Sequence, residues 1–203
     1  MSSSEEAGAK LYVGVDDSNH AGANKKGEVL VAIFSYDARA GYVNFQPSRR
    51  DVQKVHAFLS QPGNDYRFTI LSDDESRHRG YNVALVAPLL LRHYLQDHEP
   101  VREIVLACDG PLRGNQKRYL RDSFPEREVH AEGFIKKVHR PNGKLQPGLH
   151  CPYVVVAADT LAHWMYGSLS LESLLGNPRM VPISQEELRA CDKIICSGTV
   201  HPS

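Results

Sequence analysis

The chain has 203 residues, with 24 basic and 24 acidic side chains that give no net charge at neutral pH. This length suits one domain, and an apolar content of 41% allows a complete hydrophobic core. The balanced charge excludes binding to a polyanion through net charge alone, so a nucleic-acid surface would have to be a local basic patch. The longest apolar run, residues 83–91, is too short to span a bilayer, so no membrane segment is expected.

Residues 1–10 are polar and acidic and lack the basic start and apolar centre of a signal peptide. We expect them to form a disordered tail, followed by a single domain over residues 11–203 that ends in a helical extension. The four cysteines form no C-x-x-C pair, which favours reduced thiols in a cytoplasmic protein.

The first half of the chain predicts strands and one helix. Apolar runs at 11–16 and 29–34 are typical of strands, and 42–46 follows closely enough to complete an antiparallel meander. A helix is expected to begin at Ser48, a residue type that caps helix N-termini well. Residues 66–71 alternate weakly and predict a short additional strand.

The middle of the chain alternates between helical and extended patterns. A helix is predicted over 78–97, a buried strand over 103–110, a basic helix over 113–121 and a strand over 127–135. The polar residues 136–150 are then expected to form a long loop.

The last part of the chain predicts two more helices. An apolar run at 153–158 leads into a helix that begins near Asp159, and a final helix covers 184–195. Strands followed by alternating helices and strands predict an α/β fold with a mixed sheet, in which a meander precedes parallel strands and helices cover both faces.

Three apolar runs end on aspartate: "YVGVDD" at Asp16 and Asp17, "IVLACD" at Asp109 and "VVVAAD" at Asp159. Buried strands reach water at their ends, where residues from distant parts of the chain meet in many α/β proteins. Neighbouring carboxylates stay ionised together when a cation neutralises them, and Mg²⁺ or Mn²⁺ prefers oxygen ligands. The alternative is structural, because aspartate also binds backbone amides at strand ends and helix N-termini.

Two histidines lie near these acids. His163 follows Asp159 by four residues and shares its helix face, where it would relay protons or lie near a metal. His20 lies in the segment after Asp17. Both histidines also suit ordinary packing. The acidic residues 72–76 form a rival cluster that a solvated turn explains equally well.

The stretch "YVGVDDSNHAG" resembles the opening of the type 2 ribonucleases H and of other RNase H-like families, in which a strand ends in Asp-Glu before a small residue and glycine. The resemblance assigns the first acid to Asp16, the second to Asp17 and the small position to Ser18. "IVLACDG" is similar to the later strand that ends in Asp-Gly, and "VVVAADTLAHWMYG" resembles the closing segment. The resemblance therefore implies an RNase H-like fold, with Asp109 and Asp159 as further site residues.

Two basic segments, residues 113–121 and 136–144, are candidates for holding a phosphate backbone near these acids. Tyr119 and His139 within them are candidate stacking surfaces. Solvated surfaces explain both segments equally well. The candidate substrate-binding residues are Ser18, His20, Arg113, Lys117, Arg118, Lys136, Lys137 and Arg140.

The leading hypothesis is a nuclease or phosphodiesterase that acts on RNA, DNA or a hybrid with Mg²⁺ or Mn²⁺. Asp16, Asp109 and Asp159 would hold the metal, with Asp17 and His163 assisting. Two alternatives remain open: a non-catalytic RNase H-like module that binds nucleic acid or a protein, and a hydrolase of a small nucleotide or phosphorylated substrate.

Overall fold

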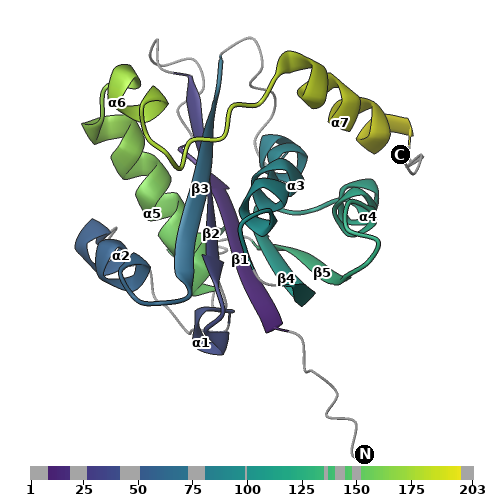
Figure 1. Cartoon of the computed structure of the whole chain (residues 1–203), viewed down its shortest axis with the longest axis horizontal. Coiled ribbons are helices and arrows are strands. Elements are labelled where there is room, and N and C mark those ends of the chain that lie inside the picture. Colours follow the sequence, from purple (N-terminus) through teal and green to yellow (C-terminus); the bar gives the residue numbers. More distant parts are fainter. Residues whose placement is uncertain are drawn as a thin grey trace, which may run out of the picture.

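A computed structural model describes residues 9–18, 27–41, 51–72, 81–98, 100–134, 137–139, 145–147 and 152–197 (Figure 1). Seven strands and seven helices lie in these ranges. The strands are β1 (Ala9–Asp17), β2 (Glu28–Ser35), β3 (Asn64–Leu71), β4 (Val101–Asp109), β5 (Glu128–Phe134), β6 (Lys137–His139) and β7 (Leu145–Pro147). The helices are α1 (Ala38–Gly41), α2 (Val52–Leu59), α3 (Tyr81–Leu95), α4 (Gly114–Asp122), α5 (Tyr153–Ser168), α6 (Leu171–Leu175) and α7 (Gln185–Ser197).

Five strands form one mixed sheet in the order β3-β2-β1-β4-β5. β2 pairs antiparallel with both β1 and β3, whereas β1–β4 and β4–β5 are parallel pairs. Only β2 therefore runs antiparallel to the other four strands. The carboxyl ends of β1, β3, β4 and β5 lie at the same end of the sheet, where β2 begins. β2 is buried along its whole length, as its continuous apolar sequence predicts.

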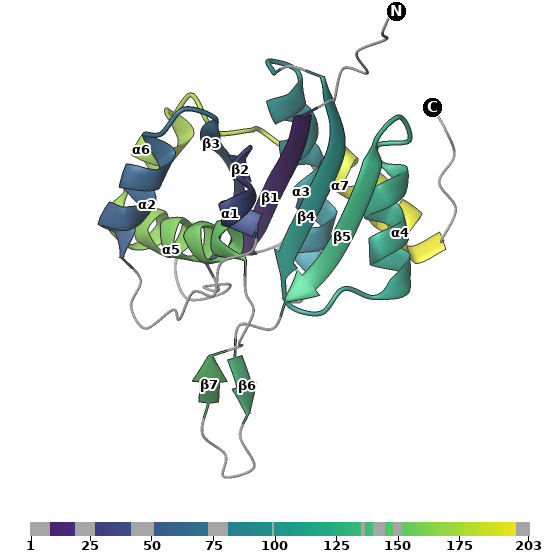
Figure 2. The same ribbon diagram turned by 90° about the horizontal axis from the view of Figure 1, so that it is seen from below.

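Helices cover both faces of the sheet, and each face has its own core. Alternate residues of β1 and β4, such as Val15 and Cys108, belong to a core shared with α3, α4 and α7. The residues between them, such as Tyr12 and Val105, belong to a second core with α1, α2, α5 and α6. We call these the α3 side and the α5 side of the sheet. Figures 1 and 2 show the same arrangement, with α5 on one side of the sheet and α3, α4 and α7 on the other.

The predicted α/β class and mixed sheet are confirmed, but residues 42–46 are not the third strand of the meander beside β2. The strand that pairs with β2 is β3 (64–71), which the sequence presented as an additional element, and residues 42–50 lie outside the described residues. Pairing with a distant strand depends on side-chain packing, which a local apolar run does not reveal.

Three local predictions also need correction. The helix expected to begin at Ser48 is α2, which begins at Val52. Asp51 caps it by accepting a hydrogen bond from the Lys54 amide at 3.2 Å. The expected loop at 136–150 contains the paired strands β6 and β7. The apolar run before Asp159 is already helical, because α5 begins at Tyr153.

Among the described residues, no helix combines the length and apolar character needed to cross a membrane.

Candidate active site

Asp16 and Asp109 occupy adjacent positions on two neighbouring parallel strands. The β1–β4 register pairs Val15 with Cys108, and each aspartate is the next residue of its strand. Because neighbouring strands lie about 5 Å apart, the two backbones remain close at this point. Val15 and Cys108 point to the α3 side, so strand alternation directs Asp16 and Asp109 to the α5 side.

Burial and electrostatics agree with this placement. Asp16 is completely buried and Asp109 is half-buried. The Asp16 Oδ1 atom accepts a hydrogen bond from the Asp17 amide at 2.8 Å. Burial raises the pKa of the Cys108 thiol, and the carboxylates of Asp16 and Asp109 raise this pKa further. Both carboxylates therefore lie within electrostatic reach of the same sulfur atom.

Asp159 lies in the second turn of α5, not at the start of the helix. The positive end of the helix dipole acts within the first turn, so it does not stabilise this carboxylate. The helix packs Val155 and Val156 against Ala107, which precedes Asp109 by two residues. Asp159 follows Val155 by four residues, so it lies one turn further along the helix stripe that faces β4.

His163 accompanies Asp159 on α5, as predicted. The His163 Nε2 atom lies 3.5 Å from the Asp159 Oδ1 atom, and the two side chains are 12% and 14% exposed. When the imidazole is protonated, this distance allows an ion pair with the carboxylate, although His163 Nε2 makes no hydrogen bond within the described part of the chain.

The donor chemistry fits a hard divalent cation, but the geometry limits how many ligands the protein supplies. Among the residues that the structure describes, no three His, Cys, Asp or Glu side chains form a group that could hold a metal ion. Mg²⁺ is often held by one or two carboxylates, with water and substrate phosphates as its other ligands. Asp16 and Asp109 suit such a two-carboxylate site.

Asp17 and Ser18 have different surroundings from Asp16. Strand alternation directs Asp17 to the α3 side, and its side chain is only 2% exposed. Ser18 continues the pairing of β1 with β2: its amide donates to the Val29 carbonyl at 2.9 Å, and its Oγ accepts from the Val29 amide at 3.1 Å. These contacts give Ser18 a structural role at the end of the strand.

Glu28 is a further buried acid at the end of the sheet that carries Asp16 and Asp109, and the sequence did not single it out. It begins β2, is 1% exposed and shares the α3 side with Leu30 of the same strand. A glutamate that opens a continuous apolar run was the available signal, since an ionisable side chain is rarely buried completely.

The basic helix α4 lies on the α3 side of the sheet (Figure 2), whereas strand alternation directs Asp16 and Asp109 to the α5 side. Arg113 precedes this helix and lies only four residues beyond Asp109, whereas Lys117 and Arg118 follow along α4. Arg113 is therefore the basic residue of this segment that is nearest to Asp109 in the sequence.

The predicted stacking role of Tyr119 is wrong. Its ring is 3% exposed, and its hydroxyl donates to the Leu85 carbonyl at 3.3 Å, so a base cannot reach the ring face. The remaining candidates, His20, Lys136 and Arg140, and the side chains of Lys137 and His139, lie outside the described part of the chain.

Comparison with known proteins adds no assignment to this geometry. No protein-family model matches the chain, and no curated protein sequence matches it significantly.

Proposed function

We propose that this protein has an RNase H-like fold and is a divalent-metal-dependent nuclease or phosphodiesterase acting on RNA or DNA. Asp16 and Asp109 hold Mg²⁺ or Mn²⁺, and α5, which carries Asp159 and His163, packs on the same side of the sheet. The observation that carries the proposal is the β1–β4 register, which sets two aspartates next to each other on one side of the sheet.

The topology supports the fold assignment. The sheet order β3-β2-β1-β4-β5, with β2 alone antiparallel, fits the RNase H-like arrangement that the motifs at Asp16, Asp109 and Asp159 suggest. α3 and α4 connect the parallel strands on one side, and α5 follows β5 on the other. Fold alone does not determine activity, so the proposal depends on the acids.

The chain's own groups have distinct tasks in this proposal. Asp16 and Asp109 supply negatively charged oxygen ligands from rigid strand ends, which fixes their separation. A bound divalent ion would lower the pKa of water and neutralise charge on a phosphodiester. His163 lies within ion-pairing distance of the Asp159 carboxylate and would accept or return a proton there. Arg113 offers a guanidinium to the substrate backbone.

The test is incubation of the full chain with labelled RNA, DNA and hybrid substrates in Mg²⁺ or Mn²⁺. We expect metal-dependent cleavage, and Asp109→Asn should lower its rate about 100-fold or more because it removes a charge that acts in the transition state. The matched control is Asp97→Asn, an exposed aspartate beyond the end of α3, which should leave the rate unchanged. Absence of cleavage, or equal rates for Asp109→Asn and wild type, would contradict the proposal.

A non-catalytic RNase H-like module is the second candidate. It is favoured by the absence, among the described residues, of three potential ligands grouped closely enough for a metal. Thermal unfolding with and without Mn²⁺ separates the two candidates. A metal at one hundred times its dissociation constant adds about 2.7 kcal/mol to the stability of a protein that binds it specifically. A module without a metal site would show no such gain, and Asp109→Asn would melt like wild type in both buffers.

A further inference from the structure

A second concave site lies on the α3 side of the sheet, away from Asp16 and Asp109. A cavity of about 890 Å³ opens between α3, α4 and α7, next to the turn that joins α4 to β5. Figure 1 shows these three helices grouped on one side of the sheet. The volume is in the range of sites that hold small organic ligands.

Three arginines from different elements line this cavity: Arg92 of α3, Arg121 of α4 and Arg127 of the turn before β5. Arg127 donates from Nε to the Val101 carbonyl at 3.1 Å, which fixes the orientation of its guanidinium. The guanidinium carbon of Arg92 lies 5.9 Å from the centroid of the Phe124 ring. Arg92 and Arg121 are exposed at the mouth of the cavity, and neither has an ion pair with any residue that the structure describes.

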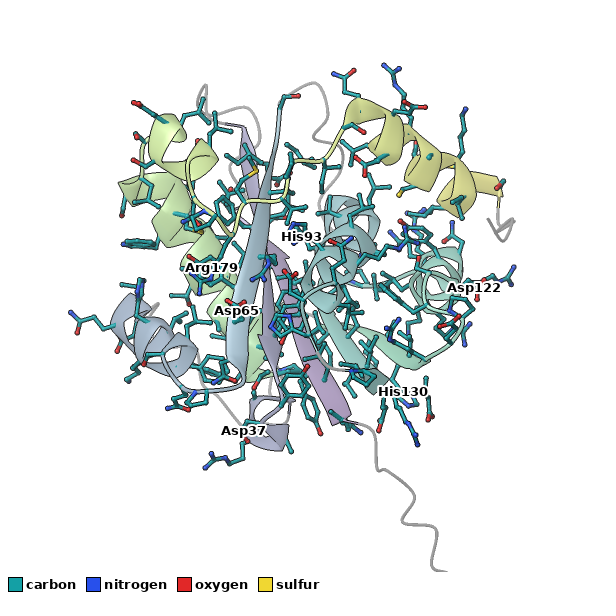
Figure 3. The ribbon with its side chains drawn as sticks, in the orientation of Figure 1. Asp37, Asp65, His93, Asp122, His130 and Arg179 are labelled. Carbon is teal, nitrogen blue, oxygen red and sulfur yellow. The ribbon has the colours of Figure 1, made fainter. Side chains whose placement is uncertain are left out.

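The acids of this cavity do not neutralise the arginines. Glu187 caps α7: its Oε2 atom accepts from the Ser184 amide at 2.8 Å and from the Ser184 hydroxyl at 2.7 Å. These hydrogen bonds lower the pKa of Glu187. Asp122 extends from the end of α4 and is exposed (Figure 3). Two acids against three arginines leave the cavity with one excess positive charge.

The accessible part of the remaining lining is apolar and is contributed by the half-buried side chains of Leu89 and Ile194. Tyr119 and Phe124 lie behind them, each 3% exposed, so they support the wall but offer no ring face to a ligand. An anion with a flat, partly apolar body matches this combination better than a bare anion does, because the apolar walls gain contacts only from such a body. Guanidinium groups bind phosphate with two parallel hydrogen bonds, and a carboxylate such as Asp122 can accept hydrogen bonds from ribose hydroxyls.

We propose that the cavity between α3, α4 and α7 binds a nucleoside monophosphate. Arg92 and Arg121 hold the phosphate, Arg127 supports them, and the base lies against the apolar wall. This site is separate from the candidate active site and does not depend on the proposed nuclease activity.

The test is calorimetric titration of the full chain with the four ribonucleoside monophosphates, with adenosine and with inorganic phosphate. EDTA in the buffer prevents binding through a metal at Asp16 and Asp109. We expect at least one monophosphate to bind saturably, and more tightly than adenosine or inorganic phosphate. Arg92→Ala and Arg121→Ala should each weaken that binding about tenfold or more, since each removes charge-assisted hydrogen bonds.

Two further variants make the result specific. Arg189→Ala removes an exposed arginine of α7 that does not line the cavity, so it should leave the affinity unchanged. Ala190→Trp adds bulk to the lining and should abolish binding while the thermal transition stays cooperative. The proposal is overturned if no monophosphate binds at millimolar concentration, if adenosine binds as tightly as the best monophosphate, or if Arg189→Ala weakens binding as much as Arg121→Ala.

Discussion

At the scale of single residues, Gly14 determines how closely α5 approaches the sheet. A Cβ atom on Gly14 would lie 2.2 Å from the carbonyl carbon of Val154 and 2.5 Å from the amide nitrogen of Val155. Both contacts are with backbone atoms, which cannot rotate away as the end of a side chain can. The close approach of α5 at this point also brings the helix that carries Asp159 towards the face that carries Asp16.

Gly14→Ala should therefore destabilise the protein by roughly 1–3 kcal/mol, the usual cost of overpacking a core. Urea unfolding followed by circular dichroism measures the change. Gly167→Ala is the matched control: Gly167 lies in α5 with no atom within 4 Å of its added Cβ, so alanine should stabilise the helix by up to about 1 kcal/mol. Equal stability of Gly14→Ala and wild type would show that α5 does not pack tightly on β1.

At the scale of elements, the segment after α6 covers the outer edge of β3. The Phe68 amide donates to the Arg179 carbonyl at 3.2 Å, and the Val181 amide donates to the Phe68 carbonyl at 2.8 Å. Arg179 also donates from Nε to the Asp65 Oδ1 atom at 2.8 Å, and these two residues lie side by side in Figure 3. The segment thus satisfies part of an edge that would otherwise be open to another chain.

The charge on Asp65 stabilises this attachment in a pH-dependent way. Burial raises the pKa of Asp65, but hydrogen bonds from Arg179 and Arg67 outweigh burial and hold the pKa below its usual value. A carboxyl group with a lowered pKa in the folded state contributes stability above its unfolded pKa of about 3.9. That contribution is lost as the pH falls through the lower, folded-state value.

Asp65→Asn should lower the stability at pH 7 by about 1–3 kcal/mol, because the hydrogen bonds to two guanidinium groups lose their charge. The variant should also lose less stability than wild type between pH 5 and pH 3. Denaturant unfolding at several pH values measures both effects. Asp97→Asn changes an exposed aspartate and should stay within about 0.5 kcal/mol of wild type. A wild-type pH slope retained in Asp65→Asn would assign the acid sensitivity to other carboxyl groups.

At the scale of the whole molecule, the cysteines report on the integrity of the sheet. Cys108 is completely buried in β4, with β1 on one side and β5 on the other. Burial and the neighbouring carboxylates of Asp16 and Asp109 raise the pKa of its thiol, so little reactive thiolate forms. Cys196 is exposed near the end of α7.

Iodoacetamide should therefore modify Cys196 in the native protein and leave Cys108 unmodified, as peptide mass spectrometry can show for each cysteine. With increasing urea, modification of Cys108 should follow the global unfolding transition, because central strands open only with the whole domain. Cys196→Ser should remove the early modification at that position. Modification of Cys108 at native rates similar to those of Cys196 would contradict the buried position of β4.

Local sequence patterns predicted most elements correctly but not their partners. The runs at 11–16, 29–34 and 103–110 are strands within one or two residues, because continuous apolar sequence marks strands that are covered on both faces. The run "VVVAAD" had the same appearance but belongs to a helix. Periodicity does not separate a buried strand from a buried helix over so few residues.

The sequence by itself determined the α/β class, the strand ends that carry Asp16 and Asp109, and the placement of Asp159 and His163 on one helix face. These are properties of neighbouring residues. Only the tertiary structure decided that β3 completes the meander, that Asp16 and Asp109 are adjacent, and that α4 lies on the other side of the sheet. The physical reason is that register and layer depend on contacts such as Gly14 with Val154, between segments far apart in the chain.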